Sequence, residues 1–400
     1  MNAPSLSRIL LCGGLIVSLS MGVRHGFGFF LPPMTAEFGW TRETFAFALG
    51  LQNLVWGAAQ PFTGALADRF GAVRVLIVGA LLYAAGLVLM TVSSTGPTFS
   101  LSAGVLLGLA LSCTTYSVIY GVIGRQCPAE KRSQSMGISA AAGSFGQFLM
   151  VPTERWLIDS QGWMSALFIL AAMAVLIAPL AIGLREPAHA TAHVGHKQSL
   201  SEALREAFSY PSFQLLMAGY FVCGFQVVFI GVHLPAFLKD KGLPGEVASI
   251  ALALIGLFNV FGTYLAGQWG ARLPKRRLLS AIYLIRAAAI VVFLSVPLTP
   301  ASVYVFAAVM GFLWLSTVPL TNGLIAHIFG PAFLGMLSGF VFFSHQVGSF
   351  LGVWLGGFIY DRAGNYDLVW YLSIGLGVMA AIVNWPIREQ PIVRVAPAGA

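Results

Sequence analysis

Long apolar segments recur along the whole chain and are separated by short polar connections. Each is close to the ~20 residues that a helix needs to cross the hydrocarbon core of a bilayer. The pattern predicts an all-α membrane protein with twelve transmembrane helices. No small-residue cleavage pattern follows the first segment, so a retained helix is favoured over a signal peptide. The predicted helix centres lie near Ser20, Val55, Leu82, Leu111, Gly143, Leu170, Cys223, Ile255, Val291, Met310, Ser344 and Leu376.

Composition strengthens this interpretation and excludes a soluble enzyme. Hydrophobic residues make up 58% of the 400 residues, and charged residues make up 9%. Soluble domains carry about 25% charged residues, so this chain lacks the polar surface that a water-exposed globule needs. The four cysteines form no CxxC pair, which favours structural thiols over disulfides or a zinc site.

The distribution of basic residues predicts the orientation. With an even number of spans, both termini lie on one side, and that side receives 15 of the 22 Lys and Arg. The opposite side receives 5, and Arg24 and Arg286 lie inside spans. Basic residues are enriched in cytoplasmic loops, so both termini are expected in the cytoplasm, in an inner membrane of bacterial type. This topology explains the net charge of +8 without a nucleic-acid partner.

The longest hydrophilic connection divides the chain into two groups of six spans. We expect a first bundle over residues 1–184, a cytoplasmic linker over 185–210, a second bundle over 211–387 and a tail over 388–400. Three histidines in the linker are interpreted as a solvated cluster rather than a metal site, and we expect no cofactor. They are His189, His193 and His196.

The two halves repeat with a constant offset of 203 residues. Two parallel six-helix repeats imply pseudo-symmetric bundles, with a binding site between them near the bilayer midplane. The matched pairs are Leu31-Pro32 with Leu234-Pro235, Gly39 with Gly242, Gly64 with Gly267, Arg69 with Arg272, and Arg74 with Arg277.

Residues 64–74, Gly-Ala-Leu-Ala-Asp-Arg-Phe-Gly-Ala-Val-Arg, carry a specific motif. The motif resembles the signature loop between helices two and three of the major facilitator superfamily, which implies the major facilitator fold and transport. In its second copy, Ala271 stands where the aspartate would be. Such a loop acts as a conformational latch, in which a glycine permits close helix contact and an aspartate meets a helix N-terminus. The latch residues would be Gly64, Asp68, Arg69, Gly71 and Arg74.

Within that superfamily, residues 360–367, Tyr-Asp-Arg-Ala-Gly-Asn-Tyr-Asp, resemble the loop before the last helix of monocarboxylate and oxalate–formate carriers. The fifth helix lacks the Gly-Pro pair typical of drug–proton antiporters. The chain departs from animal monocarboxylate carriers on helix eight, where it has Asn259 and no charged residue. Anion binding by the arginine of that helix therefore cannot be carried over.

Arg24 is the first candidate for substrate contact. All 14 Asp and Glu fall outside the predicted span cores, so no acidic residue is expected at its depth. A charge inside a span costs at least about 2.5–3.5 kcal/mol unless it faces water or a partner. We expect Arg24 to face the central cavity and to bind a carboxylate cargo, with snorkelling or backbone carbonyls as the alternative. For Arg286, a structural role or snorkelling towards Arg276 and Arg277 is favoured.

Other polar residues form stripes on the predicted helices, and those on helices one and seven should face the cavity. Interhelical hydrogen bonding remains open for each of them. The remaining substrate-binding candidates are Asn53, Tyr116, Tyr120, Gln147, Gln226, Asn259, Asn322 and His345. Three histidines can titrate near neutral pH and are candidates for proton coupling, namely His25, His233 and His345.

Together these observations predict a monomeric carrier of small organic anions, with monocarboxylates favoured, that works by alternating access as a proton symporter. Anion exchange would also satisfy the sequence. Glycines that let helices approach and slide would be Gly22, Gly26, Gly348 and Gly352. The alternatives are proton-driven efflux of amphipathic compounds and a non-transporting receptor on the same scaffold. A membrane enzyme is disfavoured, because no nucleophile, base or metal ligands converge at one depth.

Overall fold

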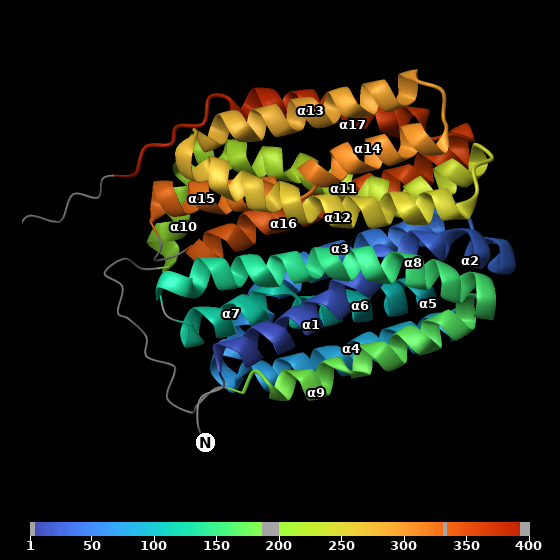
Figure 1. Cartoon of the computed structure of the whole chain (residues 1–400), viewed down its shortest axis with the longest axis horizontal. Coiled ribbons are helices and arrows are strands. Elements are labelled where there is room, and N and C mark those ends of the chain that lie inside the picture. The colour runs from blue at the N-terminus through green and yellow to red at the C-terminus, as the bar shows by residue number, and fades with distance from the viewer. Residues whose placement is uncertain (1–4, 128, 186–199, 331–333, 393–400) are drawn as a thin grey trace, which may run out of the picture.

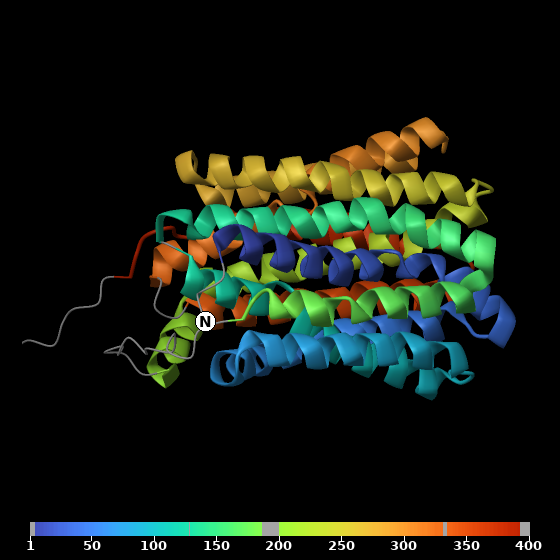
Figure 2. The ribbon, with the colours of Figure 1, turned by 60° about the horizontal axis from the view of Figure 1, so that its bottom comes forward.

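The computed structural model describes residues 5–127, 129–185, 200–330 and 334–392. Within these ranges the chain forms helices and no strand. The helices run side by side along the long axis of the molecule (Figure 1, Figure 2). Ten of them are long and apolar enough to cross a membrane.

Among its described residues, the first half contains six passes built from eleven elements. They are α1 (Leu6–His25), η1 (Phe27–Phe29), α2 (Leu31–Phe38), α3 (Arg42–Phe70), α4 (Ala72–Val92), α5 (Gly96–Phe99), η2 (Ser100–Leu106), α6 (Leu107–Thr114), α7 (Tyr116–Gln126), α8 (Ala129–Val175) and α9 (Ile177–Ile182).

The second half contains a short amphipathic helix and six further passes. Its elements are α10 (Leu200–Ser209), α11 (Pro211–Asp240), α12 (Gly245–Arg272), α13 (Lys275–Ser295), α14 (Pro300–Leu313), α15 (Thr317–Phe329), α16 (Leu334–Ala363) and α17 (Asp367–Asn384).

The predicted number of twelve passes is confirmed, although two of them need explanation. The segment labelled α8 contains two helices that meet at Gly162, where the chain reverses direction. Gly162 has φ 79°, which only glycine adopts without strain. This segment therefore supplies the fifth pass and, with α9, the sixth (Figure 1). The second pass, α3, has 29 residues and can span a bilayer, but it is less apolar than the ten candidate spans.

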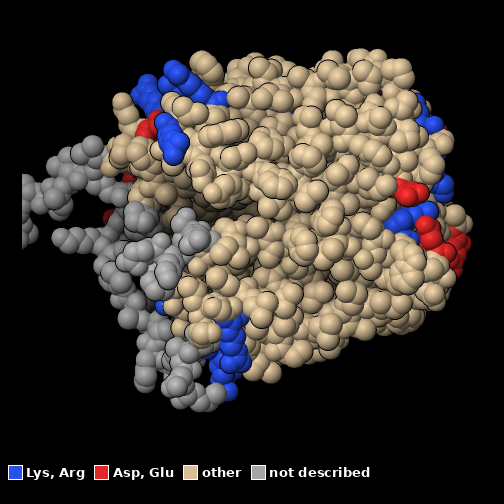
Figure 3. Space-filling view, in the orientation of Figure 1, with Lys and Arg blue, Asp and Glu red and all other residues tan. Residues whose placement is uncertain are grey.

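Charged side chains gather at the two ends of the molecule and leave a broad uncharged belt between them (Figure 3). We call the end that carries the N-terminus, α10 and the residues after α17 the terminal end, and the opposite end, where α2 and α5 lie, the distal end (Figure 1). The belt is what a helical membrane protein presents to lipid.

The two halves pack tightly against each other in their distal part. A Cβ built at Gly28 of η1 would lie only 2.6 Å from the carbonyl oxygen of Val232 on α11. Further along, the rings of Trp56 on α3 and Phe342 on α16 have centroids 5.3 Å apart. Four apolar residues of the second half join the core of the first, namely Val228, Val232, Ala236 and Val353.

Toward the terminal end the halves separate. A Cβ built at Gly64 of α3, Gly137 of α8 or Gly339 of α16 would meet nothing within 4 Å. The molecular surface is hollowed between the halves on this side, beside the grey atoms of Figure 3. The structure is therefore closed at the distal end and open at the terminal end.

The connection between the halves contains α10, inside the predicted linker of 185–210. Residues 186–199, with the three linker histidines, lie outside the described residues, as do residues 393–400 of the predicted tail. The described start of the tail is held by the second half, because Ile392 N donates to Ile328 O at 2.9 Å and Glu389 accepts from Arg276 N at 2.7 Å.

Candidate functional site

A small pocket lies between the halves, just beneath their distal contact. Its polar wall comes from α1 and α3 of the first half, with Arg24, His25, Gln52 and Asn53. The facing wall is apolar and comes from the second half, with Val227, Val228, Gly231, Val232 and Trp314. The pocket therefore presents one guanidinium to an otherwise uncharged lining.

Arg24 is held in this pocket by neutral partners. Its Nη2 donates to Asn53 Oδ1 at 2.6 Å, and its guanidinium carbon lies 5.1 Å from the centroid of the Trp56 ring. Asn53 is itself fixed, because its Nδ2 donates to Leu49 O at 2.7 Å. Arg24 Nε is buried without a hydrogen-bond partner. Arg24 faces the pocket between the halves, as expected, and keeps donor capacity for a further acceptor.

His25 lies beside Arg24 in the pocket wall, and one of its nitrogens is occupied. Its Nδ1 lies 2.5 Å from Met21 O, one turn back on the same helix. Because that carbonyl only accepts, Nδ1 carries a proton here and Nε2 is left as the exchangeable position.

Aromatic candidates come together farther along the interface. Tyr116 and Tyr120 of α7 have ring centroids 5.6 Å apart. Tyr120 lies within electrostatic range of Tyr220 on α11, and the Tyr220 and His345 rings are 4.9 Å apart. Tyr116 points to α8, because a Cβ at Gly143 would overlap its hydroxyl. Tyr120 of the first half and His345 of the second half are thus both near Tyr220.

Two other candidates are committed to contacts between helices. Gln147 of α8 donates to Leu252 O of α12 at 3.1 Å, which joins the halves. Asn259 of α12 donates to Ser144 at 2.8 Å and accepts from Leu315 N at 2.9 Å. A third candidate, Asn322 of α15, makes its contact within its own helix. It is half-buried, and its Nδ2 donates to Val318 O at 3.1 Å.

The prediction that the polar stripe of helix seven faces the cavity is wrong. Gln226 and His233 are buried inside the second half, where Gln226 donates to Ser373 O of α17 at 2.9 Å and His233 Nε2 donates to Val353 O of α16 at 2.8 Å. The apolar face of α11 lines the pocket instead. Helical periodicity located the stripe, but it could not tell which of two buried faces meets the other half.

Arg286 has a structural role and does not snorkel. It is fully buried, and its Nη2 donates to the carbonyl oxygens of Leu313 and Trp314. These carbonyls lie where the pass breaks between α14 and α15, so the helix itself leaves them without partners. Nη1 lies 3.5 Å from both Cys223 Sγ and Gln226 Oε1.

The expectation that no acidic residue lies at the depth of Arg24 is also wrong, because Glu154 lies against Gly26, two residues beyond Arg24 at the end of α1. The fifth pass runs on from Val151 to Gly162, so Glu154 lies within it and is fully buried. Neither carboxylate oxygen has a hydrogen-bond partner. The sequence carried a signal for this continuation, since Pro152 is followed by helix-compatible residues up to the glycine at 162.

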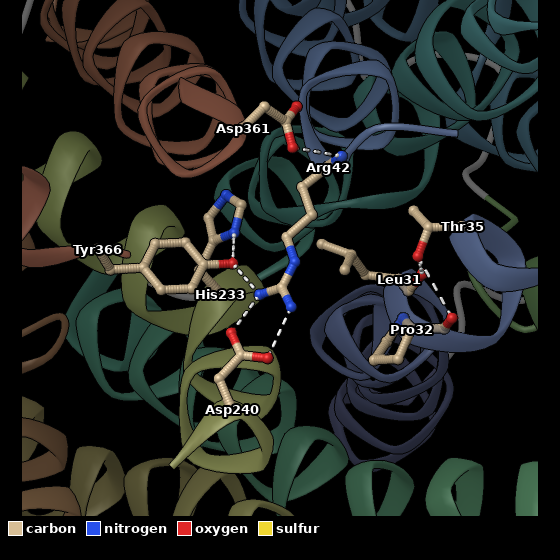
Figure 4. Close-up of polar contacts among 8 residues, drawn as sticks. All are labelled: Leu31, Pro32, Thr35, Arg42, His233, Asp240, Asp361 and Tyr366. Atoms are coloured by element: carbon tan, nitrogen blue, oxygen red, sulfur yellow. Dashed lines mark hydrogen bonds and ion pairs between the residues drawn. The ribbon is translucent and has the colours of Figure 1, made fainter. Parts of the chain in front are cut away.

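A network of charged and polar residues closes the distal end, and we call it the distal gate (Figure 4). Arg42, the first residue of α3, donates through both terminal nitrogens to the carboxylate of Asp240 at the end of α11, each at 2.7 Å. Arg42 Nη1 also donates to the Tyr366 hydroxyl at 2.8 Å, and the guanidinium stacks on the Tyr360 ring at 3.7 Å. Leu31 of α2 lies beside it (Figure 4).

Asp361 of the second half caps α3 of the first half. Its two carboxylate oxygens accept from Arg42 N at 3.1 Å and from Glu43 N at 2.6 Å. A carboxylate at a helix N-terminus satisfies free N–H groups and complements the helix dipole. The gate is completed by Glu43, which accepts from Arg362 and Trp354, each at 3.2 Å.

His233 is tied to the gate through Tyr366. Its Nδ1 lies 3.2 Å from the Tyr366 hydroxyl, and its Nε2 donates to Val353 O. Burial raises the pKa of Tyr366 above its ordinary value, more than Arg42 lowers it, so the hydroxyl keeps its proton. Tyr366 can therefore accept from Arg42 and donate to a neutral His233.

The gate escaped the sequence interpretation, although its parts were visible. Asp361, Arg362 and Tyr366 fall within the loop that resembles monocarboxylate and oxalate–formate carriers. Arg42 follows Thr41, a helix N-cap residue, and looked like an ordinary loop cation. Pairing across the halves requires three-dimensional proximity over 198 residues, which local pattern does not reveal.

The described side chains of the predicted latch make only local contacts. Gly71 adopts φ 89° between α3 and α4, and Arg74 Nη1 lies 3.4 Å from Phe70 O within the same turn. Arg69 lies over the neighbouring Phe70 ring. The close contact expected at Gly64 is absent, and the Asp68 side chain lies outside the described part.

Comparison with protein families gives one match over most of the chain. The model of the Major Facilitator Superfamily matches residues 10–352. Among solved structures, a bacterial homologue of the human lysosomal transporter Spinster, in an inward-facing and unoccupied conformation, has a TM-score of 0.76 at 17% identity and covers all of both chains.

Curated relatives carry transporter names of different kinds. An uncharacterised MFS-type transporter, YcxA of Bacillus subtilis, is 26% identical, with 96% of this chain and 95% of the relative covered. Monocarboxylate transporter 11 of Homo sapiens is 26% identical, with coverage of 90% and 78%. Multidrug resistance protein MdtH of Proteus mirabilis is also 26% identical, with coverage of 88% and 87%.

Proposed function

Because the chain belongs to the Major Facilitator Superfamily, and is therefore a multi-pass membrane transporter rather than an enzyme, we propose that it carries small organic anions. Monocarboxylates are the favoured class. In this proposal the anion binds Arg24 in the pocket between the halves, and the carrier works as a monomer in a bacterial inner membrane.

One observation carries the choice of an anion, namely the environment of Arg24. Its partners are an amide oxygen and an indole ring, and its Nε is buried without a partner. A guanidinium with neutral partners in a weakly polar pocket attracts a carboxylate, which can accept two parallel hydrogen bonds. The apolar wall of Val227, Val228 and Val232 suits a short hydrocarbon chain attached to that carboxylate. The similarity to monocarboxylate transporter 11 supports the same class.

Orientation and mechanism follow from the charge distribution. The excess of basic residues on the side of the termini favours a cytoplasmic location for the terminal end. The described conformation, with a closed distal gate and separated terminal halves, would then be open to the cytoplasm. Rocking of the halves would break the distal gate and engage the latch of Gly64, Asp68, Arg69, Gly71 and Arg74.

Proton coupling is part of the proposal, with the histidines as carriers of the proton. His25 lies beside Arg24 in the pocket wall. His233 accepts from Tyr366 only while it is neutral, because a doubly protonated ring has no acceptor nitrogen. Its protonation would therefore loosen the distal gate. His345 lies on α16, with its ring 4.9 Å from that of Tyr220 on α11 of the same half.

The experiment is ligand-induced thermal stabilisation of the purified protein by acetate, pyruvate and oxalate. A ligand at about 100 times its dissociation constant adds about 2.7 kcal/mol of stability. We expect stabilisation of the wild type, none of Arg24→Gln, and a reduced effect in Arg24→Lys, which keeps the charge but loses the two-pronged geometry. Equal stabilisation of all three proteins would refute Arg24 as the anion contact.

Efflux of amphipathic compounds is the second candidate, and the apolar second-half wall of the pocket favours it. The similarity to multidrug resistance protein MdtH points the same way. Stabilisation by hydrophobic cations in both wild type and Arg24→Gln, with no response to carboxylates, would establish this class of substrate instead.

A further inference from the structure

Glu154 is a carboxyl group that the anion pocket does not use. It lies on α8, is fully buried, and neither of its oxygens has a hydrogen-bond partner. It faces α1 so closely that a Cβ added at Gly26 would overlap its Oε2. An unpaired carboxylate in such surroundings would cost far more than proteins tolerate, and the group binds a proton instead.

The groups around Glu154 do not stabilise an ionised carboxylate in place of the bound proton. From α1, Arg24 donates to Asn53 and forms no ion pair with Glu154, and His25 lies against Met21 O. From α4, Tyr83 lies within electrostatic range and donates to Ser20 O at 2.9 Å. On α8 itself, Arg155 pairs with Asp159 at 2.7 Å. Glu246, at the start of the neighbouring α12, is exposed at the surface.

Glu154 lies against the segment that joins Arg24 to the distal contact between the halves. Gly26 ends α1, which bears Arg24, and η1 begins one residue later. Gly28 of η1 packs against α11 of the second half. A Cβ built at Gly28 would lie only 2.6 Å from Val232 O. Arg155, next to Glu154, approaches Gly245 at the start of α12, where a built Cβ would lie 2.7 Å from its guanidinium carbon. Gly26, which covers Glu154, is thus continuous with η1, and η1 packs against α11 of the second half.

We propose that Glu154 is a proton-binding site of the carrier, occupied while the distal end is closed. Opening of the distal end separates η1 from α11 and admits water, in which the carboxyl group can ionise. Since the closed conformation binds the proton and the open one releases it, acid favours the closed conformation. The proposal rests on alternating access in the proposed function but not on the identity of the cargo.

The first test is infrared spectroscopy of the purified, ligand-free protein at neutral pH. The carbonyl stretch of a protonated carboxylic acid should be present in the wild type, absent in the isosteric Glu154→Gln, and retained in Glu246→Gln, which alters an exposed glutamate. A spectrum of Glu154→Gln that matches the wild type in this band would overturn the proposal, because Glu154 would then be ionised.

The second test measures the distal distance between spin labels at Ala36→Cys and Lys241→Cys, both exposed positions on opposite halves. Acidification should shorten the distance in the doubly labelled parent and in the same protein with His25→Gln. With Glu154→Gln, acidification should no longer shorten the distance, because no group at this position can take up a proton. Shortening on acidification that survives Glu154→Gln would refute the proposal, whereas protonation of His233 would lengthen the distance and is distinguished by its sign. Neither test contains substrate, so failure of the anion assignment leaves both outcomes unaffected.

Discussion

Arg42 of α3 and Asp240 of α11 form a two-pronged ion pair across the distal gate, with both nitrogen–oxygen distances at 2.7 Å. The side chains retain 18% and 30% exposure, so solvent screens part of their attraction. The two parallel hydrogen bonds compensate for part of the screening, because they hold the guanidinium and the carboxylate in one orientation. This pair joins the first residue of one half's second pass to the end of the other half's first pass.

We predict that Arg42→Gln and Asp240→Asn each shift the protein toward a distally open conformation. The coupling energy between them should be about 1 kcal/mol, which corresponds to roughly a fivefold change in the ratio of closed to open protein. A double-mutant cycle on the distal spin-label distances measures it. Strictly additive effects of the two substitutions would show that the pair does not hold the gate.

Asp361 supplies the gate's second contact through backbone groups of α3. Loss of an N-cap acceptor costs about 1 kcal/mol, so Asp361→Ala should open the gate to a similar extent as loss of the ion pair. Asp361→Asn keeps one acceptor oxygen, so its gate should open less than that of Asp361→Ala and more than that of the wild type. The readout is labelling of a cysteine at Val232, which is 9% exposed behind the gate, by a membrane-impermeant thiol reagent. Equal labelling in Asp361→Ala and the Val232→Cys parent would contradict the capping role.

Tyr366 is shared between Arg42 and His233, so its hydroxyl serves two partners. We predict that Tyr366→Phe lowers the stability by about 1–2 kcal/mol, because the buried His233 nitrogen is left without a donor. Adding His233→Leu to Tyr366→Phe should recover part of the loss, since the orphaned acceptor is removed. Thermal unfolding in detergent compares the three variants. A double variant less stable than Tyr366→Phe alone would argue against this hydrogen bond.

Asn53 fixes Arg24 without neutralising it, through the 2.6 Å hydrogen bond to its amide oxygen. Asn53→Asp has nearly the same shape but supplies a carboxylate that competes with the cargo. We expect carboxylate affinity to fall at least tenfold, or about 1.4 kcal/mol, while the fold is preserved. Isothermal titration with the anion that stabilises the wild type measures the change. An unchanged affinity would mean that the cargo carboxylate does not meet Arg24.

Apolar periodicity, basic-residue counts and the internal repeat predicted the twelve-pass fold, because lipid constrains every span in the same way. The position of Arg24 in the pocket could be predicted because a charged residue inside a span must face water or a partner. Gln226, His233 and Glu154 were misplaced for a common reason, since each depends on where a helix ends or on which of two buried faces it presents. Arg42, Asp240 and Asp361 are unremarkable loop residues until the halves bring them together.

Arg286 provides the contrast to Arg24, because both are arginines within spans without a carboxylate partner. Arg286 binds the carbonyl oxygens of Leu313 and Trp314 at the break between α14 and α15. Arg286→Met leaves these buried acceptors unsatisfied, at about 1–3 kcal/mol each, so unfolding should occur several degrees lower. Arg24→Met should unfold close to the wild type but lose carboxylate binding.

The affinity of the folded fraction of Arg286→Met for the carboxylate should equal that of the wild type. If Arg286→Met instead kept its stability and lost binding, the buried guanidinium would be a cargo contact reached in another conformation. Thermal unfolding and titration on the same preparations separate the two arginines, because one stabilises a broken helix and the other faces the pocket. Arg286→Lys should not rescue the stability, since a single ammonium cannot reproduce the two-carbonyl contact and the contacts to Cys223 and Gln226 together.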